Sequence, residues 1–217
     1  MKKLAIFDFD GTLFDSICDV VICFNKALTD HNLPTLTREE YIPCLGGNID
    51  EIISLVLGEN CTPQNLEAVK ETYLEYYNAS KKELTLPFPN SYEVLKKLQD
   101  KNILLAINSN RLNYSLNEFV QRHFSDIDFV AIEGHDYPHP SKPHPYGVNK
   151  IMDMANVKAD DAVYIGDSIT DIKTAQNAGI DCILVTWGYG NENDYENEYV
   201  SYVIDDICDL LSLFEEN

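Results

Sequence analysis

The chain has little positive charge for its size. Among its 217 residues, 16 are Lys or Arg and 36 are Asp or Glu, which gives a net charge of −20. A surface of that sign repels nucleic-acid phosphates and anionic lipid, so we expect neither nucleic acid nor a membrane as a partner. An anionic substrate must then be attracted by a local positive site, such as a metal ion with a few placed cations.

Long apolar runs and paired cysteines are also lacking. The first apolar run, Leu4–Phe7, stops at Asp8, which is too short for a signal-peptide core, and no later run approaches the length of a membrane span. The six cysteines are scattered, without a C-x-x-C pair or zinc-type spacing. We therefore expect a cytoplasmic protein with reduced thiols.

Two carboxylates follow the first apolar run, in the sequence D-F-D-G-T at residues 8–12. Side chains i and i+2 of a strand share one side, so we expect Asp8 and Asp10 to leave the strand tip together. Two such charges about 4 Å apart repel by roughly 4 kcal/mol at an effective dielectric constant near 20. The pair therefore predicts a divalent cation that compensates the repulsion.

Short apolar runs alternate with amphipathic stretches along the rest of the chain. The predicted strands are 4–9, 103–107, 129–132, 162–165, 182–185 and an edge strand near 202–204. The predicted helices are 91–101, 114–124, 145–155, 169–178 and 206–214. The alternation predicts an α/β fold, a Rossmann-like three-layer core with a parallel sheet. Ligands of such folds bind at the carboxyl ends of the strands.

The segment between the first two strands carries helical periodicity over about 70 residues and almost no strand signal. Asn48 and Glu51 predict a capping box, and Thr62 before a proline predicts the start of another helix. We predict an all-helical cap domain, residues 15–85, inserted into a core domain made of residues 1–14 and 86–217.

Three more polar clusters follow predicted strands or lie near them: Ser109-Asn110, Ser141-Lys142-Pro143, and G-D-S-I-T-D at residues 166–171. Taken singly, each has an ordinary interpretation as a turn, a helix cap or a solvated lysine. Four clusters in order predict phosphoryl transfer. That reaction uses a carboxylate nucleophile, a second carboxyl that exchanges protons, a hard cation, and a lysine and hydroxyl on the phosphate.

In these motifs the chain resembles the haloacid-dehalogenase-superfamily hydrolases with a helical cap, close to the phosphoglycolate phosphatase group. The resemblance runs the full length, with D-F-D-G-T, S-N, K-P and G-D-S-x-T-D in the family's order and spacing. It implies that Asp8 is the nucleophile, Asp10 the general acid/base and Lys142 a further catalytic residue. It also implies that Gly46-Gly47 forms the cap loop that faces substrate.

The resemblance further implies the cofactor and its ligands. Mg²⁺ is held by the Asp8 carboxylate, the Asp10 backbone carbonyl and Asp167, and Asp171 supports the metal from behind. The phosphate is bound by Ser109, Asn110, Lys142, Gly11 and Thr12. The implied partner is a small phosphorylated metabolite, and the chain is expected to be a monomer or a homodimer.

Two positions depart from the family pattern. Pro89-Asn90 stands where relatives often have Pro-Gly before the helix after the cap, and Asn tolerates left-handed backbone. Arg111 follows Ser109-Asn110 where phosphoglycolate phosphatases often have Lys, which weakens the narrow substrate assignment. The segment 186–190 resembles the loop after the fifth strand in phosphoglycolate phosphatase-like members.

Alternatives to a phosphatase are a sugar phosphomutase and a non-catalytic binding module on the same fold. A mutase must hold a second phosphate, but residues 41–53 contain no Lys, Arg or His, which favours hydrolysis. A degenerate module usually lacks a nucleophile or metal ligand, and none is missing here. The substrate itself stays open: phosphoglycolate, a nucleotide monophosphate, pyrophosphate and a sugar phosphate are all compatible.

Two aromatic or histidine-rich segments need separate interpretations. His135, His139 and His144 lie in a proline-rich loop without helical i, i+4 spacing, which disfavours a zinc site and leaves the role of the loop open. Tyr73, Tyr76 and Tyr77 have helical spacing, so we expect them to pack the cap rather than stack on a base.

Overall fold

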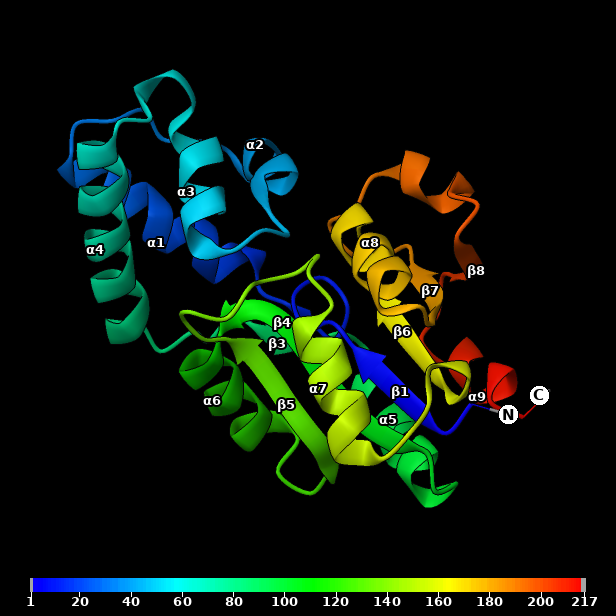
Figure 1. Cartoon of the computed structure of the whole chain (residues 1–217). Coiled ribbons are helices and arrows are strands. Elements are labelled where there is room, and N and C mark those ends of the chain that lie inside the picture. The colour runs from blue at the N-terminus through cyan, green and yellow to red at the C-terminus, as the bar shows by residue number, and fades with distance from the viewer. Residues whose placement is uncertain (1, 216–217) are drawn as a thin grey trace.

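The computed structural model describes residues 2–215 and has a six-stranded sheet at its centre (Figure 1). The strand order is β5-β4-β1-β6-β7-β8, and every neighbouring pair is parallel. The strands are β1 (Leu4–Phe7), β4 (Leu104–Leu112), β5 (Phe129–His135), β6 (Ala162–Gly166), β7 (Asp181–Val185) and β8 (Val200–Ile204). The sheet confirms the predicted parallel architecture, with β1 in its interior.

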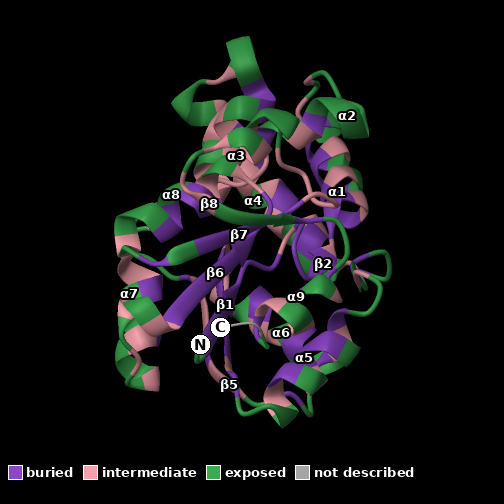
Figure 2. Ribbon diagram, turned by 90° about the vertical axis from the view of Figure 1, so that its right-hand side faces the viewer, coloured by how far each residue is buried: buried purple, intermediate pink, exposed green. Residues whose placement is uncertain are grey.

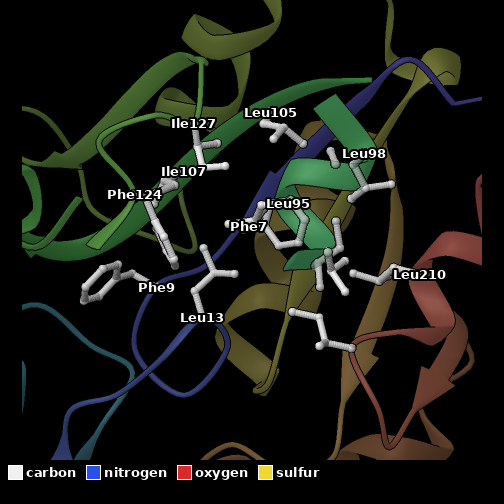
Figure 3. Close-up of a cluster of buried hydrophobic side chains, with 14 of the residues drawn as sticks. Phe7, Phe9, Leu13, Leu95, Leu98, Leu105, Ile107, Phe124, Ile127 and Leu210 are labelled. Carbon is white, nitrogen blue, oxygen red and sulfur yellow. The ribbon is translucent and has the colours of Figure 1, made fainter. Parts of the chain in front are cut away.

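Helices cover both faces of the sheet. One face packs against α5 (Ser91–Asp100), α6 (Asn113–His123) and α9 (Asp209–Leu213), and the other against α7 (Tyr146–Ala155) and α8 (Ile169–Ala178). Alternate residues of β1 enter the two apolar clusters, since Phe7 packs on the first face and Ile6 on the second. Figure 3 shows Phe7 beside Leu95, with Leu98 and Leu210 on the same face. The predicted three-layer α/β core is confirmed.

One local prediction about an element end is wrong. We expected the second strand of the core to stop at Ile107, but β4 continues to Leu112 through an irregular register with β5 between Asn108 and Leu112. An irregularity of this kind changes the direction of the side chains that a regular strand would present. Asn90, directly before α5, has the left-handed backbone that its residue type allows, with φ of 64°.

The segment between β1 and β4 is helical, as the periodicity predicted. It contains α1 (Ile17–Asp30), α2 (Arg38–Tyr41), α3 (Ile49–Leu57) and α4 (Pro63–Ala79). Short turns of 3-10 helix lie at Ile42–Cys44, Gly58–Asn60, Ala159–Asp161 and Glu192–Glu196. The capping box of Asn48 and Glu51 is confirmed, and the Thr62 side chain accepts a hydrogen bond from the Asn65 N–H.

The helical segment has an apolar cluster of its own. Phe24 of α1 stacks on Tyr73 of α4 with 3.9 Å between ring centroids, and Tyr73 stacks on Tyr77 at 5.5 Å. Tyr76 lies partly buried against the same cluster, so the expectation that these tyrosines pack the cap is confirmed.

The two ends of the helical segment pair as a two-stranded antiparallel sheet, in which β2 (Phe14–Asp15) precedes the segment and β3 (Leu86–Pro87) follows it. Figure 1 shows the helical segment beyond the carboxyl end of β1. The division into a cap of residues 15–85 and a two-part core stays a prediction.

In Figure 2 the sheet strands are largely buried, whereas the helices are exposed on their outer faces. Within residues 2–215, no helix combines the length and the apolar character needed to cross a membrane.

Candidate active site

Three buried carboxylates meet beyond the carboxyl ends of β1 and β6. Asp8 follows β1, Asp167 follows β6, and Asp171 lies in the first turn of α8. One oxygen from each lies within 4.8 Å of the others, and residues 2–215 contain no other group of three or more His, Cys, Asp or Glu placed to hold a metal. All three side chains are buried, so their charges need compensation inside the protein.

Lys142 supplies part of that compensation. Its Nζ lies 2.8 Å from Asp8 Oδ1 and 2.8 Å from Asp171 Oδ1. Burial alone disfavours the ammonium, yet Asp171 and Asp8 raise the pKa of Lys142 well above its ordinary value. With Lys142 charged and the three carboxylates ionised, the cluster has a net charge of −2.

A divalent cation fits this donor set. It would bring the net charge of the cluster to zero, and carboxylate oxygens are the ligands that Mg²⁺ prefers. Without it, burial raises the pKa of Asp8 well above its ordinary value, with Asp171 and Asp167 adding to the effect. Burial, followed by the charge of Asp171, likewise raises the pKa of Asp167 to about 7. Both shifts come mainly from burial of the charged form, and repulsion among the carboxylates adds to them.

Asp171 is occupied by protein donors at both oxygens. Oδ1 accepts from Lys142, and Oδ2 accepts from the N–H groups of Asp167 and Ser168, each at 3.1 Å, and from the Ser168 hydroxyl at 3.0 Å. These bonds fix the turn after β6 that carries Asp167. They suit a residue that supports a metal ligand from behind.

Asp10 does not join the cluster of carboxylates. Its oxygens accept from Arg111 Nε at 3.1 Å and Nη2 at 2.5 Å, and from Ser16 Oγ at 2.5 Å. The expectation that both carboxylates leave the strand side by side is wrong, because β1 ends at Phe7 and the chain turns before Asp10. Both residues nevertheless line one cavity.

Arg111 is the main residue of the site to which the sequence analysis gave no role. Its guanidinium lies over the rings of Phe9 and Phe119, each centroid at 5.2 Å, and over Tyr77 at 5.6 Å. It also donates hydrogen bonds to the Tyr77 and Ser115 hydroxyls. Only 8% of the side chain is exposed, so Arg111 is fixed between Asp10, α4 and α6. A charged residue directly after Ser109-Asn110 was the available signal.

The predicted phosphate-binding residues lie around the cluster. Ser109 is buried, and its hydroxyl accepts from the Arg111 N–H at 3.1 Å. The Asn110 side chain accepts from the Lys142 N–H at 2.7 Å and donates to the carbonyls of Lys142 and Gly46. Asn110 thus links the loop that carries Lys142 to the cap. Phosphate contacts by both residues stay predictions.

Gly11 and Thr12 pack directly on Asp167. Gly11 has φ of +82°, and a Cβ on it would lie 2.4 Å from Asp167 Oδ2. The hydroxyl of Thr12 lies 3.4 Å from Asp167 Oδ1. The turn therefore needs glycine both for its backbone angle and for its approach to the carboxylate.

The loop after β7 holds the other side of Asp167. The Tyr189 N–H donates to Asp167 Oδ2 at 2.6 Å, and its hydroxyl donates to Asp15 at 2.8 Å and accepts from the Ser16 N–H at 2.7 Å. Tyr189 therefore joins a metal-ligand candidate to the start of the cap. The sequence analysis noted segment 186–190 but gave Tyr189 no role; its flanking glycines were the signal.

Gly46 and Gly47 of the cap line the same cavity as Asp8, Asp10 and Lys142. The Gly46 carbonyl accepts from Asn110, and the neighbouring Asn48 amide donates to the Ser141 hydroxyl at 3.1 Å. The loop at residues 46–48 therefore contacts both polar loops, at Asn110 and at Ser141. Its contact with substrate stays a prediction.

The histidine-rich loop contacts the cap instead of forming a group suited to a metal within the described chain. His135 is buried and its Nε2 bonds to the His139 carbonyl, while the Tyr137 hydroxyl donates to Asp50 of α3 at 2.9 Å. The loop borders the active-site lysine and meets the first turn of α3.

Comparisons with known proteins show the family of the chain. The family described as haloacid dehalogenase-like hydrolases matches residues 5–185. The chain belongs to this family. Its relatives include a phosphoglycolate phosphatase of Vibrio parahaemolyticus, 28% identical over 97% of this chain and 95% of the relative. Another is a phosphoglycolate phosphatase of Pseudomonas syringae pv. tomato, 29% identical over 97% and 79% of the two chains.

Solved structures of this family share the whole fold. A Lactobacillus delbrueckii protein, provisionally named a phosphoglycolate phosphatase, superposes with a TM-score of 0.91 at 27% identity over 98% of both chains. A Bacteroides fragilis protein, provisionally named a haloacid dehalogenase-like hydrolase, gives 0.90 at 26% identity over 97% and 100%. The chain is an enzyme, a phosphatase of the haloacid dehalogenase-like family.

Proposed function

We propose that this phosphatase hydrolyses a small phosphate monoester in the cytoplasm, in a Mg²⁺-dependent reaction that passes through an aspartyl-phosphate on Asp8. The observation that carries the proposal is the meeting of Asp8, Asp167 and Asp171 with Lys142 beside a cavity that Asp10 also lines. These groups supply a nucleophile, an oxygen-ligand set, a phosphate-binding cation and a second carboxyl in one place.

The first step belongs to Asp8. Its Oδ1 is fixed by Lys142 at 2.8 Å and by the Phe9 N–H at 2.6 Å, so the carboxylate is held in one orientation. Attack on phosphorus forms a bond to the Asp8 carboxylate and breaks the bond to the ester oxygen. The departing oxygen takes a proton from Asp10, so neutral alcohol leaves.

The second step reverses the role of Asp10. Now ionised, it takes a proton from water as the water oxygen attacks the phosphorus, the bond to Asp8 breaks, and inorganic phosphate is released. Arg111 and Ser16 hold the Asp10 carboxylate at short distance in a fixed orientation. They are positioning residues for this proton transfer.

The metal would be held by the carboxylates of Asp8 and Asp167 and by the backbone carbonyl of Asp10, with Asp171 behind them. When bound, Mg²⁺ neutralises the cluster and stabilises negative charge on the phosphoryl oxygens. Lys142, Ser109 and the turn at Gly11 and Thr12 bind the remaining phosphate oxygens in this proposal.

The proposal is tested with p-nitrophenyl phosphate. We expect turnover by the wild type with Mg²⁺, loss of turnover with a chelator, and none by Asp8→Asn. Asp205→Asn is the control, because it removes the same charge at an exposed position, and it should keep full activity. Equal rates for Asp8→Asn and wild type would refute the role of Asp8.

No feature of the described cavity favours the phosphomutase alternative. A mutase needs cations for a second phosphate, and the residues that the cap contributes to the described cavity include no Lys, Arg or His. The relatives' name makes phosphoglycolate the first metabolite to assay.

A further inference from the structure

The cavity above Asp8 is lined by two chemically different sets of side chains, and its volume is about 130 Å³. The core contributes mostly polar groups, which are those described above. The helical segment contributes mostly aliphatic and aromatic side chains, here called the cap wall, which include Leu45, Ile49, Ile52, Leu74 and Tyr73.

Both cations that line the described cavity are already paired. Lys142 bridges Asp8 and Asp171, where it would meet the transferred phosphate. Arg111 is bound to Asp10 through two nitrogens and lies against three aromatic rings. A substrate anion that bound Arg111 would displace Asp10, the carboxyl that transfers the proton.

The cap has 12 acidic and 5 basic residues between positions 15 and 85, and none of the five lines the cavity. Three of these basic residues form ion pairs away from the cavity: Lys70 with Asp50, Lys81 with Glu83 and Lys82 with Glu118. Lys26 and Arg38 are exposed. A carboxylate or second phosphate on the leaving group would therefore be buried without a counter-charge, which is costly.

We propose that the physiological substrate is a phosphate monoester whose leaving group is uncharged and largely apolar or aromatic, and that the cap wall discriminates against a second anionic group. This inference rests on the proposed phosphatase function. Apolar atoms of the leaving group are stabilised when they leave water and pack against the wall. A leaving group with a carboxylate, such as glycolate, loses this stabilisation, and its carboxylate has no cation to pair with.

The test compares benzyl phosphate with its 3-carboxy derivative, which differ by one carboxylate, and includes phosphoglycolate. Released phosphate gives kcat/KM for each with Mg²⁺ present. We expect benzyl phosphate to exceed both carboxylated substrates by at least about tenfold, the ratio that 1.4 kcal/mol of discrimination produces. An equal or higher kcat/KM for a carboxylated substrate would overturn the inference without contradicting the proposed phosphatase function. Absence of turnover with every substrate, p-nitrophenyl phosphate included, would overturn the phosphatase function.

A matched pair of variants in α3 locates the discrimination. Ile52 lines the cavity, whereas Leu55 of the same helix is 58% exposed and does not line it. Ile52→Lys should raise kcat/KM for the carboxylated substrate relative to benzyl phosphate, and Leu55→Lys should leave the ratio unchanged. Ile49→Lys is the second variant if Ile52→Lys fails to fold. An unchanged ratio in a folded cavity variant, or an equal change in Leu55→Lys, would contradict the proposal.

Discussion

Replacing Asp8 by Asn should inactivate the enzyme and yet stabilise its metal-free form. Asp8 is 7% exposed and shares its site with two carboxylates and one lysine. The three carboxylates have oxygens within 4.8 Å of one another, and at that upper limit and an effective dielectric constant near 20 each of the other two repels Asp8 by about 3.5 kcal/mol. Lys142 at 2.8 Å attracts it by about 6 kcal/mol on the same scale.

The repulsions therefore exceed the attraction by about 1 kcal/mol, before the cost of keeping a carboxylate away from water. Removing the charge should raise the melting temperature by roughly 2–4 °C in a chain of this size. The gain has a definite pH dependence. Burial raises the pKa of Asp8 above its ordinary 3.8, so the folded state binds more protons than the unfolded state, and wild-type stability falls as pH rises above that value. The advantage of Asp8→Asn should widen with pH.

Thermal melts with a chelator at pH 6 and pH 8 measure this difference, and melts with Mg²⁺ should reverse it, because the wild type gains binding energy that Asp8→Asn lacks. Asp205→Asn controls for the net charge of −20. A metal-free Asp8→Asn protein that melts several degrees below wild type at pH 8 would refute the electrostatic reasoning.

Four further predictions concern the same cluster. Because the pKa of Asp167 is raised to about 7, Mg²⁺ must displace a proton at lower pH, so calorimetry should find Mg²⁺ affinity rising between pH 6 and 8. Asp167→Asn should bind weakly with a smaller rise, because the raised pKa of Asp8 remains. Gly11→Ala should abolish turnover and cost about 1–3 kcal/mol in denaturant unfolding, since φ is +82° and the methyl group would meet Asp167; full activity would show that the turn adapts. Lys142→Met should destabilise the metal-free protein by about 3 kcal/mol at pH 8, and an unchanged denaturation midpoint would contradict its pairing with two carboxylates. Inorganic phosphate should bind only after Mg²⁺, and equal calorimetric affinity without the metal would oppose the net charge assigned to the cluster.

The sequence was sufficient to predict the core because its signals are local. Four-residue apolar runs such as Leu4–Phe7 can be buried on both faces only in a covered parallel sheet. The polar clusters around Asp8, Ser109, Lys142 and Asp167 lie in segments that such a sheet brings to one edge. Their approach follows from topology, without knowledge of any side-chain direction.

The surroundings of Asp10 could not be predicted in the same way. Arg111 reaches it from a strand 101 residues away, through an irregular part of β4 that no sequence pattern announces. Tyr77 and Ser16 complete the arrangement from two segments of the cap region. Contacts of this kind depend on how the helical segment sits on the core, and helical periodicity gives the identity of a helix but not its placement.

Charge then selects substrates at two ranges. Far from the site, a net charge of −20 repels every anion, and screening limits this effect to about 8–10 Å at physiological salt. Close to the site, Lys142 and a bound divalent cation attract one phosphate, whereas the wall formed by Leu45, Ile49 and Ile52 offers nothing to a second anionic group. A molecule with a single phosphate on an apolar body meets the weaker long-range repulsion and the better short-range fit. The acidic surface and the apolar cap therefore favour the same class of substrate, by two independent physical effects.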